Sequence, residues 1–314
     1  MSALQLTNLT PRAATIGIAA TGVAYGFATF FARTLTEAGL SPITVAFARF
    51  ALVGVVLIPF LRLERHVRAA TIWGLASGAT MAMGWIAYVE GIERGDVALA
   101  GVAYMTYPLF TLAALAVVFG HRLNVRQVSG GVAVLGAAVM ALSAGASGGG
   151  LPLLTFAAPA TFGFSTAVLT ERLGPLAPAE RLASVAIGAS VALMPFLLRL
   201  PIDQVAPPGI GSWAAVVGLG VGAALIPMMV YSAAAPIVGA ARSSVAGATE
   251  LPTVLIIGGV LFGETLTAHH LAAAALIGVA IMITPVGRSS HVLPDNDEPD
   301  ADPWTESQVE TRFA

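Results

Sequence analysis

The sequence has no cysteine and no lysine, and only 10% of its residues are charged. The absence of cysteine excludes disulfide bonds, thiolate nucleophiles and cysteine-ligated metal centres. An ordinary soluble domain carries about 25% charged residues, so the shortage of charge indicates that lipid surrounds most of this chain. The net charge of -2 leaves no basic excess, which excludes nucleic acid as a partner.

Catalytic motifs are missing as well. The chain has no GxxxxGK[ST] loop, which excludes a built-in ATPase, and its apolar segments contain no HExxH motif, paired aspartates or Ser/His dyad. The adjacent residues His269 and His270 point to different sides of a helix and lack a ligand set, so we expect no metal site. The sequence therefore predicts neither an enzyme nor a bound cofactor.

Apolar residues make up 57% of the chain, and its mean hydropathy is +0.84. A helix rises about 1.5 Å per residue and the hydrocarbon core is about 30 Å thick, so about 20 apolar residues make one crossing. Ten nearly charge-free runs fit this length: 13–32, 41–61, 69–89, 97–120, 127–144, 151–170, 180–199, 211–236, 243–263 and 269–287. The first run has no cleavage site, so we interpret it as a helix and not as a removed signal peptide.

Arginine is distributed unevenly among the connections between these runs. One set of alternate connections carries Arg12, Arg62, Arg65, Arg68, Arg122, Arg126, Arg172, Arg181, Arg242 and Arg288, and the other carries Arg33, Arg94 and Arg199. Because basic residues near helix ends stay in the cytoplasm, this asymmetry predicts that residues 1–12 and the C-terminus both lie on the cytoplasmic side of a bacterial inner membrane. Residues 288–314, which hold seven of the 17 acidic residues, are a predicted disordered cytoplasmic tail.

The two halves of the chain resemble each other. The matching positions are Gly26 and Gly163, Pro42 and Pro178, Pro59 and Pro195, and Pro108 and Pro252. Five crossings is an odd number, so the second half must enter the bilayer upside down relative to the first. The sequence therefore predicts an all-α membrane protein of ten transmembrane helices, built as two inverted five-helix repeats over residues 13–146 and 147–287. Inverted repeats can expose a shared central site to each side in turn, which predicts transport.

These features resemble the EamA-type drug/metabolite transporters, a group of the DMT superfamily. The family pattern is a Ser-Pro at the start of the second helix of each repeat, an arginine within that helix, a proline in the fourth helix and a Gly-Glu-Arg-Leu at its end. The corresponding residues are Ser41, Pro42, Arg49, Pro108 and Gly120 to Leu123 in the first half, and Pro178, Pro252 and Gly263 to Leu266 in the second. Two positions depart from this pattern: His121 stands where the family has Glu, and Val185 is the counterpart of Arg49.

The resemblance implies a secondary transporter that exports amino acids or similar small polar metabolites by alternating access, although the family also includes importers and vitamin carriers. The partners it implies are a small-molecule metabolite and the lipid bilayer. Substrate identity, transport direction, coupling to protons and the choice between monomer and homodimer stay open at this point. The alternative interpretation is a membrane receptor or scaffold that acts through the acidic tail.

Arg49 and Glu250 are the main candidates for substrate binding, because a charge in the hydrocarbon costs about 2.5 kcal/mol or more and marks a functional site by default. Arg49 lies eight residues into its helix, and its planar guanidinium suits a carboxylate. Glu250 lies seven residues into the ninth run and could bind a substrate amine or take up a proton. The alternatives are an arginine that snorkels or holds backbone carbonyls, and a protonated acid that bonds a neighbouring helix.

Pro108 and Pro252 are predicted helix breaks, since proline lacks a backbone donor. Tyr104 and Tyr107 flank Pro108 in the repeat-related neighbourhood of Glu250, so we predict that both line the substrate site. Other aromatic residues of the apolar runs, which we expect mostly to pack or to anchor the interface, are Tyr25, Phe27, Trp85, Tyr88 and Tyr231. Glu90 and His121 are interpreted as interfacial residues at opposite ends of their runs.

Overall fold

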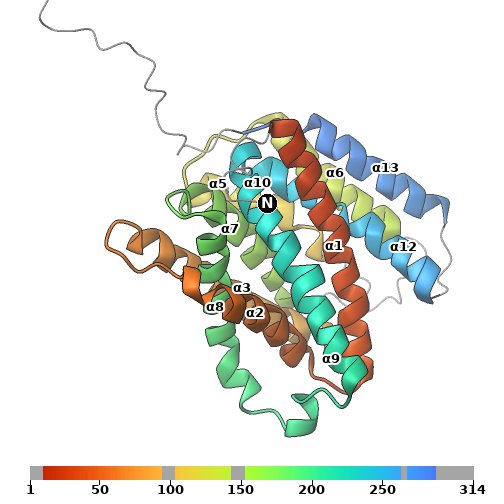
Figure 1. The fold of residues 1–314 in the computed structure, drawn as a ribbon. Helices are drawn as coiled ribbons and strands as arrows, with labels where there is room; N and C mark the ends of the chain where they lie inside the picture. The colour runs from red at the N-terminus through yellow and green to blue at the C-terminus, as the bar shows by residue number, and fades with distance from the viewer. Residues whose placement is uncertain (1–9, 94–102, 143–152, 263–266, 288–314) are drawn as a thin grey trace, which may run out of the picture.

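The computed structural model describes residues 10–93, 103–142, 153–262 and 267–287, and all regular elements in these ranges are helical (Figure 1). The first half contains α1 (Pro11–Glu37), α2 (Pro42–Leu57), α3 (Arg68–Glu93), α5 (Tyr107–Val117) and α6 (Val125–Leu142). The second half contains α7 (Ala157–Glu171), α8 (Pro178–Leu197), α9 (Ile210–Val217), the π-helical segment η5 (Gly218–Leu225), α10 (Ile226–Val238), α11 (Ala240–Gly247), α12 (Glu250–Phe262) and α13 (Ala268–Ile283). Short 3-10 turns are η2 (Ile58–Phe60), η3 (Leu153–Phe156) and η4 (Ile202–Gln204).

Helix length and composition support a multi-pass membrane protein. Seven helical stretches are long and apolar enough to cross a bilayer: Pro11–Glu37, Pro42–Phe60, Arg68–Glu90, Leu153–Glu171, Pro178–Leu197, Ile210–Val238 and Ala240–Leu261. Three further apolar helices, Tyr107–Val117, Val125–Ala141 and Ala268–Ile283, are shorter. All of them fall on the apolar runs of the sequence, but the exact number of ten crossings stays a prediction. The predicted acidic tail lies outside the described residues.

Local capping explains where the first two helices begin. The Thr10 side-chain oxygen accepts a hydrogen bond from the Ala13 N–H at 3.2 Å, and the Ser41 oxygen accepts one from the Ile43 N–H at 3.3 Å. Each cap is followed by a proline at the first helical position, Pro11 or Pro42, where the missing N–H has no intrahelical partner to lose. The family's Ser-Pro is therefore a helix start in this chain.

Small residues let α3 and α8 pack closely and join the two halves. A Cβ atom added at Gly78 of α3 would collide with the Val185 carbonyl of α8, and one added at Gly188 would collide with the Leu75 carbonyl. Since lipid offers no hydrophobic drive for helices to associate, such backbone contacts are how membrane helices gain packing energy. The α3–α8 contact is a fixed part of the scaffold.

The fourth helical segment of each half is broken near its proline. A turn at Met105 and Thr106 precedes α5, with Pro108 in its first turn, and a turn at Ala248 and Thr249 separates α11 from α12, with Pro252 in its first turn. A proline ring clashes with the carbonyl four residues earlier and removes one helical hydrogen bond, so the chain breaks one turn before it. Both breaks fall in the interior of an apolar segment.

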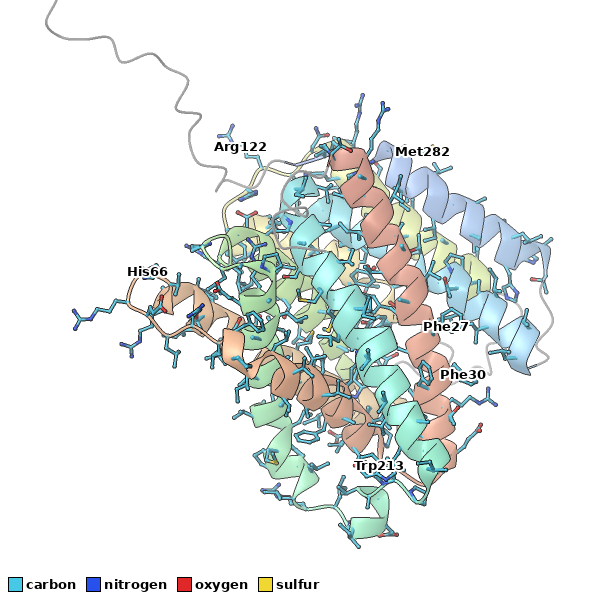
Figure 2. The ribbon with its side chains drawn as sticks, viewed as in Figure 1. Phe27, Phe30, His66, Arg122, Trp213 and Met282 are labelled. Carbon is cyan, nitrogen blue, oxygen red and sulfur yellow. The ribbon has the colours of Figure 1, made fainter. Side chains whose placement is uncertain are left out.

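Large apolar side chains cover the outside of the bundle. Figure 2 shows Phe27 and Phe30 projecting from α1, Trp213 at the start of α9, and Met282 near the end of α13. The side chains of Trp213 and Met282 are 53% and 74% exposed. An apolar exterior of this extent suits lipid contact.

The two ends of the bundle, proximal and distal, are distinguished by the connections that they hold. The proximal end holds the start of α1 and the connections 118–124 and 172–177, and the distal end holds the connections 38–41 and 198–209. At the distal end the Gln204 carbonyl accepts hydrogen bonds from the Ser41 N–H at 3.0 Å and the Thr44 hydroxyl at 2.9 Å, which ties the two connections together. In the orientation predicted from arginine, the proximal end is cytoplasmic.

Candidate ligand-binding cavity

A cavity of about 570 Å³ lies between the two halves of the chain. Its wall is mainly apolar and aromatic, with contributions from α1, α2, α3 and α6 of the first half and α7, η5, α10 and α12 of the second. A volume of this size holds a small metabolite. The residues that line it include Tyr25, Ala32, Val45, Ala46, Arg49, Met81, Trp85, Tyr88, Tyr104, Ala158, Phe162, Met228, Glu250 and Leu255.

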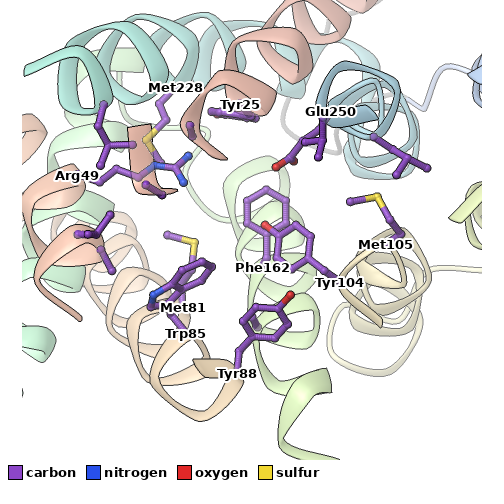
Figure 3. Close-up of a pocket in the computed structure, with 18 of the residues that line it drawn as sticks. Tyr25, Arg49, Met81, Trp85, Tyr88, Tyr104, Met105, Phe162, Met228 and Glu250 are labelled. Atoms are coloured by element: carbon purple, nitrogen blue, oxygen red, sulfur yellow. The ribbon is translucent and has the colours of Figure 1, made fainter. Parts of the chain in front are cut away.

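Arg49 and Glu250 both line this cavity, so the structure brings together the two charges that the sequence singled out. In Figure 3 the guanidinium and the carboxylate enter the cavity from different helices and point toward its interior. Among the described residues, neither group forms an ion pair within 4.0 Å, and Arg49 Nε is buried without a hydrogen-bond partner. The cavity wall therefore presents an acidic and a basic side chain that form no ion pair within the described part of the chain.

Tyr25 of α1 is the residue that contacts the guanidinium. Arg49 Cζ lies over the Tyr25 ring, 5.4 Å from its centroid, within the range of a cation–π interaction. Tyr25 is 8% exposed, so its ring is buried, whereas Arg49 is partly exposed. The guanidinium thus lies against an aromatic face, and its Nε has no hydrogen-bond partner among the described residues.

Tyr104 belongs to an aromatic wall of the cavity. Its ring lies 5.9 Å from Tyr88 and 6.2 Å from Phe162, and Tyr88 lies 5.6 Å from Trp85, centroid to centroid. These distances are typical of interacting aromatic pairs. The wall combines flat apolar faces with tyrosine hydroxyls, which suits a ligand that has an apolar part as well as charges.

Tyr107 does not line the cavity. Its side chain is 2% exposed, its hydroxyl donates to the Ser244 carbonyl at 2.8 Å, and its ring packs edge-on against Phe162 at 5.0 Å. Tyr104 and Tyr107 are three residues apart on either side of the helix break, and only Tyr104 reaches the cavity wall. Tyr107 instead joins α5 to α11 and lies behind the cavity wall.

Pro108 and Pro252 also stay outside the cavity wall. Pro108 is buried in α5, and Pro252 follows Glu250 by two positions in α12. Their effect on the site is indirect, because the breaks they impose place Tyr104 and Glu250 at the ends of short helical segments that face the cavity.

Tyr25, Trp85 and Tyr88 line the cavity although the sequence argument expected them mostly to pack, and Phe162 lines it although that argument did not single it out. Tyr25 and Phe162 are related by the repeat. Each directly precedes a repeat-related glycine, Gly26 in α1 or Gly163 in α7, and so they occupy equivalent positions of the two halves. In an inverted repeat, equivalent positions near the pseudo-two-fold axis face the same central space. The repeat alignment therefore contained the signal that identifies both.

The polar residues at the ends of the helices have local partners. His121 Nε2 lies 3.2 Å from a carboxylate oxygen of Glu171, whose side chain is 7% exposed, so His121 is more than a residue at headgroup level. The two ring nitrogens of His270 lie 3.2 Å from the Thr267 nitrogen and 3.1 Å from the Ala141 carbonyl. In the described part of the chain, no cluster of three potential metal ligands occurs. Glu90 is exposed at the end of α3.

Comparison with known proteins connects this architecture to a family. The family model described as "EamA-like transporter family" matches twice, over residues 12–143 and 151–285. One solved structure, titled only "Crystal structure of protein", superposes with a TM-score of 0.69 at 18% sequence identity and covers 88% of this chain and 98% of its own, which establishes likeness of fold. No curated protein matches the sequence. Because the two matches together cover most of the chain and coincide with its two halves, this protein belongs to the EamA-like transporter family.

Proposed function

We propose that this protein is a secondary transporter that exports a small polar metabolite of the amino-acid type across a bacterial inner membrane by alternating access. The observation that carries the proposal is a cavity between the two halves that Arg49 and Glu250 both line, with no ion pair to either group among the described residues. Both termini lie in the cytoplasm in this proposal, so the proximal end of the bundle faces inward. Substrate binding needs no cofactor in this scheme.

The cavity lies toward one end of the bundle. Its lining residues on α1, Tyr25 and Ala32, are in the half of that helix that leads to the distal connection 38–41, and those on α2, Val45 and Arg49, follow directly after it. Similarly, Ala158 is near the start of α7. The lining set thus extends from the middle of the bundle toward the distal end, which supports an outward-facing arrangement.

Close helix contacts also occur in the proximal half. A Cβ atom at Gly22 of α1 would collide with the Thr249 side chain and the Gly247 carbonyl, and the Thr249 hydroxyl donates to the Ala19 carbonyl at 2.7 Å. Arg242 reinforces this end, since its Nε donates to the Thr15 hydroxyl at 3.0 Å and its Nη1 donates to the Thr284 carbonyl. A carrier needs one end closed while the other is accessible, and this pattern supports such a state.

The charges favour a zwitterionic substrate. Arg49 can hold a carboxylate with its planar fork, and Glu250 can hold an ammonium group, while the aromatic wall accepts the apolar part. Burying both ligand charges against protein charges offsets the cost of removing them from water. Glu250 is also the group that would take up a proton if transport is coupled to the proton gradient.

A flux experiment tests this function. Purified protein in liposomes loaded with an equimolar mixture of the proteinogenic amino acids is expected to release a subset of them, as measured by mass spectrometry with and without an imposed pH gradient. The Arg49→Ala and Glu250→Gln variants are expected to release none above empty liposomes. Wild-type rates in both variants, or no flux of any amino acid from the wild type, contradict the assignment.

A further inference from the structure

Arg49 and Glu250 present a physical problem. Opposite charges that face one cavity attract each other, and the attraction strengthens as the effective dielectric constant around them falls. Yet among the described residues they form no ion pair with each other. A side chain of the cavity wall that contacts one of the two groups can keep it away from its opposite.

Tyr25 is placed to do this. Figure 3 shows it on α1, near both the Arg49 guanidinium and the Glu250 side chain. Its ring face takes the guanidinium, with Arg49 Cζ 5.4 Å from the centroid. An aromatic face attracts a cation without neutralising its charge, so a guanidinium held this way keeps its N–H donors for a ligand.

The residue that follows Tyr25 makes a close contact between α1 and α12. A Cβ atom at Gly26 would collide with the Thr253 side chain, and the Glu250 carbonyl lies 3.4 Å from that point. The backbone of α1 therefore rests directly on the first turn of α12, which carries Glu250. The same helix contact therefore places both Tyr25 and Glu250 beside the cavity.

We propose that Tyr25 is a positioning residue, whose ring holds the Arg49 guanidinium apart from the Glu250 carboxylate so that both charges stay available to a ligand that carries both signs. The consequence for transport rests on the proposed function, but the separation of the charges is a property of the empty cavity. It can therefore be measured without any substrate.

The test is a double-mutant cycle on thermal unfolding in detergent micelles. The variants Arg49→Gln, Glu250→Gln and their combination are made in three backgrounds: wild type, Tyr25→Phe and Tyr25→Leu. Tyr25→Phe keeps the ring face, and Tyr25→Leu removes it. In the Tyr25→Leu background the freed guanidinium is expected to pair with Glu250. The unfolding temperature of the combined variant then falls by less than the sum of the two single decreases. We expect this difference to be about 3 °C larger in the Tyr25→Leu background than in the Tyr25→Phe background.

Equal coupling between Arg49 and Glu250 in all three backgrounds overturns the proposal. If Tyr25→Leu does not fold, phenylalanine with one, two or three ring fluorines at position 25 provides a series of nearly constant shape. Fluorine weakens the attraction of the ring for a cation, so the coupling is expected to rise with each fluorine. A coupling that is independent of fluorination overturns the proposal in the same way.

Transport gives a second readout that separates this inference from the function itself. With the amino-acid mixture as probe, Tyr25→Leu is expected to raise KM at least about fivefold above that of Tyr25→Phe while kcat changes less, because the loss falls on binding. If the wild type transports none of these probes, the proposed function fails, whereas the unfolding cycle still decides the role of Tyr25.

Discussion

The contact of α1 with α11 and α12 and the contact of α7 with α5 are equivalent in the repeat but differ in chemistry. In the first pair, Tyr25 and Glu250 lie beside a glycine contact and place a charge on the cavity wall. In the second pair, Phe162 and Tyr104 contribute aromatic faces, and Tyr107 is used for a hydrogen bond to Ser244. The two halves thus share this helix packing, but the charged groups differ: Arg49 occurs in the first half and Glu250 in the second.

The largest effect is expected from removing that unique chemistry. Arg49→Ala and Glu250→Gln should each lower the rate of substrate release at least about 100-fold, because the remaining charge faces an apolar wall without a counter-charge. The matched controls are Arg33→Gln and Glu37→Gln, which break a pair with side chains 46% and 64% exposed at the end of α1. Membrane insertion should be unchanged in all four variants, as checked by size-exclusion chromatography of the extracted protein. Comparable rates in site and control variants would remove the site assignment.

A smaller effect is expected from opening the proximal contact between α1 and α11. Gly22→Val adds a Cβ atom with two methyl groups where the Cβ atom alone would collide with the Thr249 side chain and the Gly247 carbonyl. We expect transport to fall about 10-fold, because the added side chain forces α1 and α11 apart and opens the proximal end. Gly278→Val is the control, since nothing lies within 4 Å of a Cβ atom at that position.

The absence of native cysteine makes the opening directly measurable. A single Ala246→Cys probe is fully buried at the proximal contact, and it should resist a membrane-impermeant maleimide in the parent protein. With Gly22→Val added, the same cysteine should react at least about tenfold faster from the proximal side. Unchanged labelling would show that Gly22 does not close this end.

A moderate change in stability is expected at the proximal ends of α5 and α7. His121→Glu, which restores the residue usual in the family, places a second carboxylate against the buried Glu171. This repulsion should lower the unfolding temperature in detergent by about 3 °C or more. His66→Glu is the control, because His66 is 74% exposed. An equal loss in both variants would mean that the His121–Glu171 contact is not specific.

The smallest effect is expected from the acidic C-terminal segment. Deletion of residues 289–314 should leave transport within about twofold of the full chain, because the cavity and both helix pairs lie before it. The measurement is the same liposome release assay. Loss of function on deletion, with the helical bundle intact by circular dichroism, would favour the receptor or scaffold interpretation.

Much of the architecture followed from composition and spacing. The apolar runs, the repeat and the Ser-Pro helix start at Ser41 and Pro42 each depend on local properties of the chain, and the helices fall where these patterns place them. The contact partners did not follow. Tyr104 and Tyr107 look alike in sequence, but the break between them at Met105 and Thr106 turns one ring into the cavity and the other into a buried contact.

By itself, the sequence determined that this chain is a helical membrane protein with two related halves, since burial of backbone polar groups in lipid leaves helices as the only solution for such apolar runs. It also marked Arg49 and Glu250, because charges in apolar segments are costly. Only the tertiary structure decided that these two charges share one cavity, that they form no ion pair among the described residues, and that Tyr25 contacts the guanidinium. Those facts depend on how helices far apart in the chain pack against each other, and no local pattern encodes that packing.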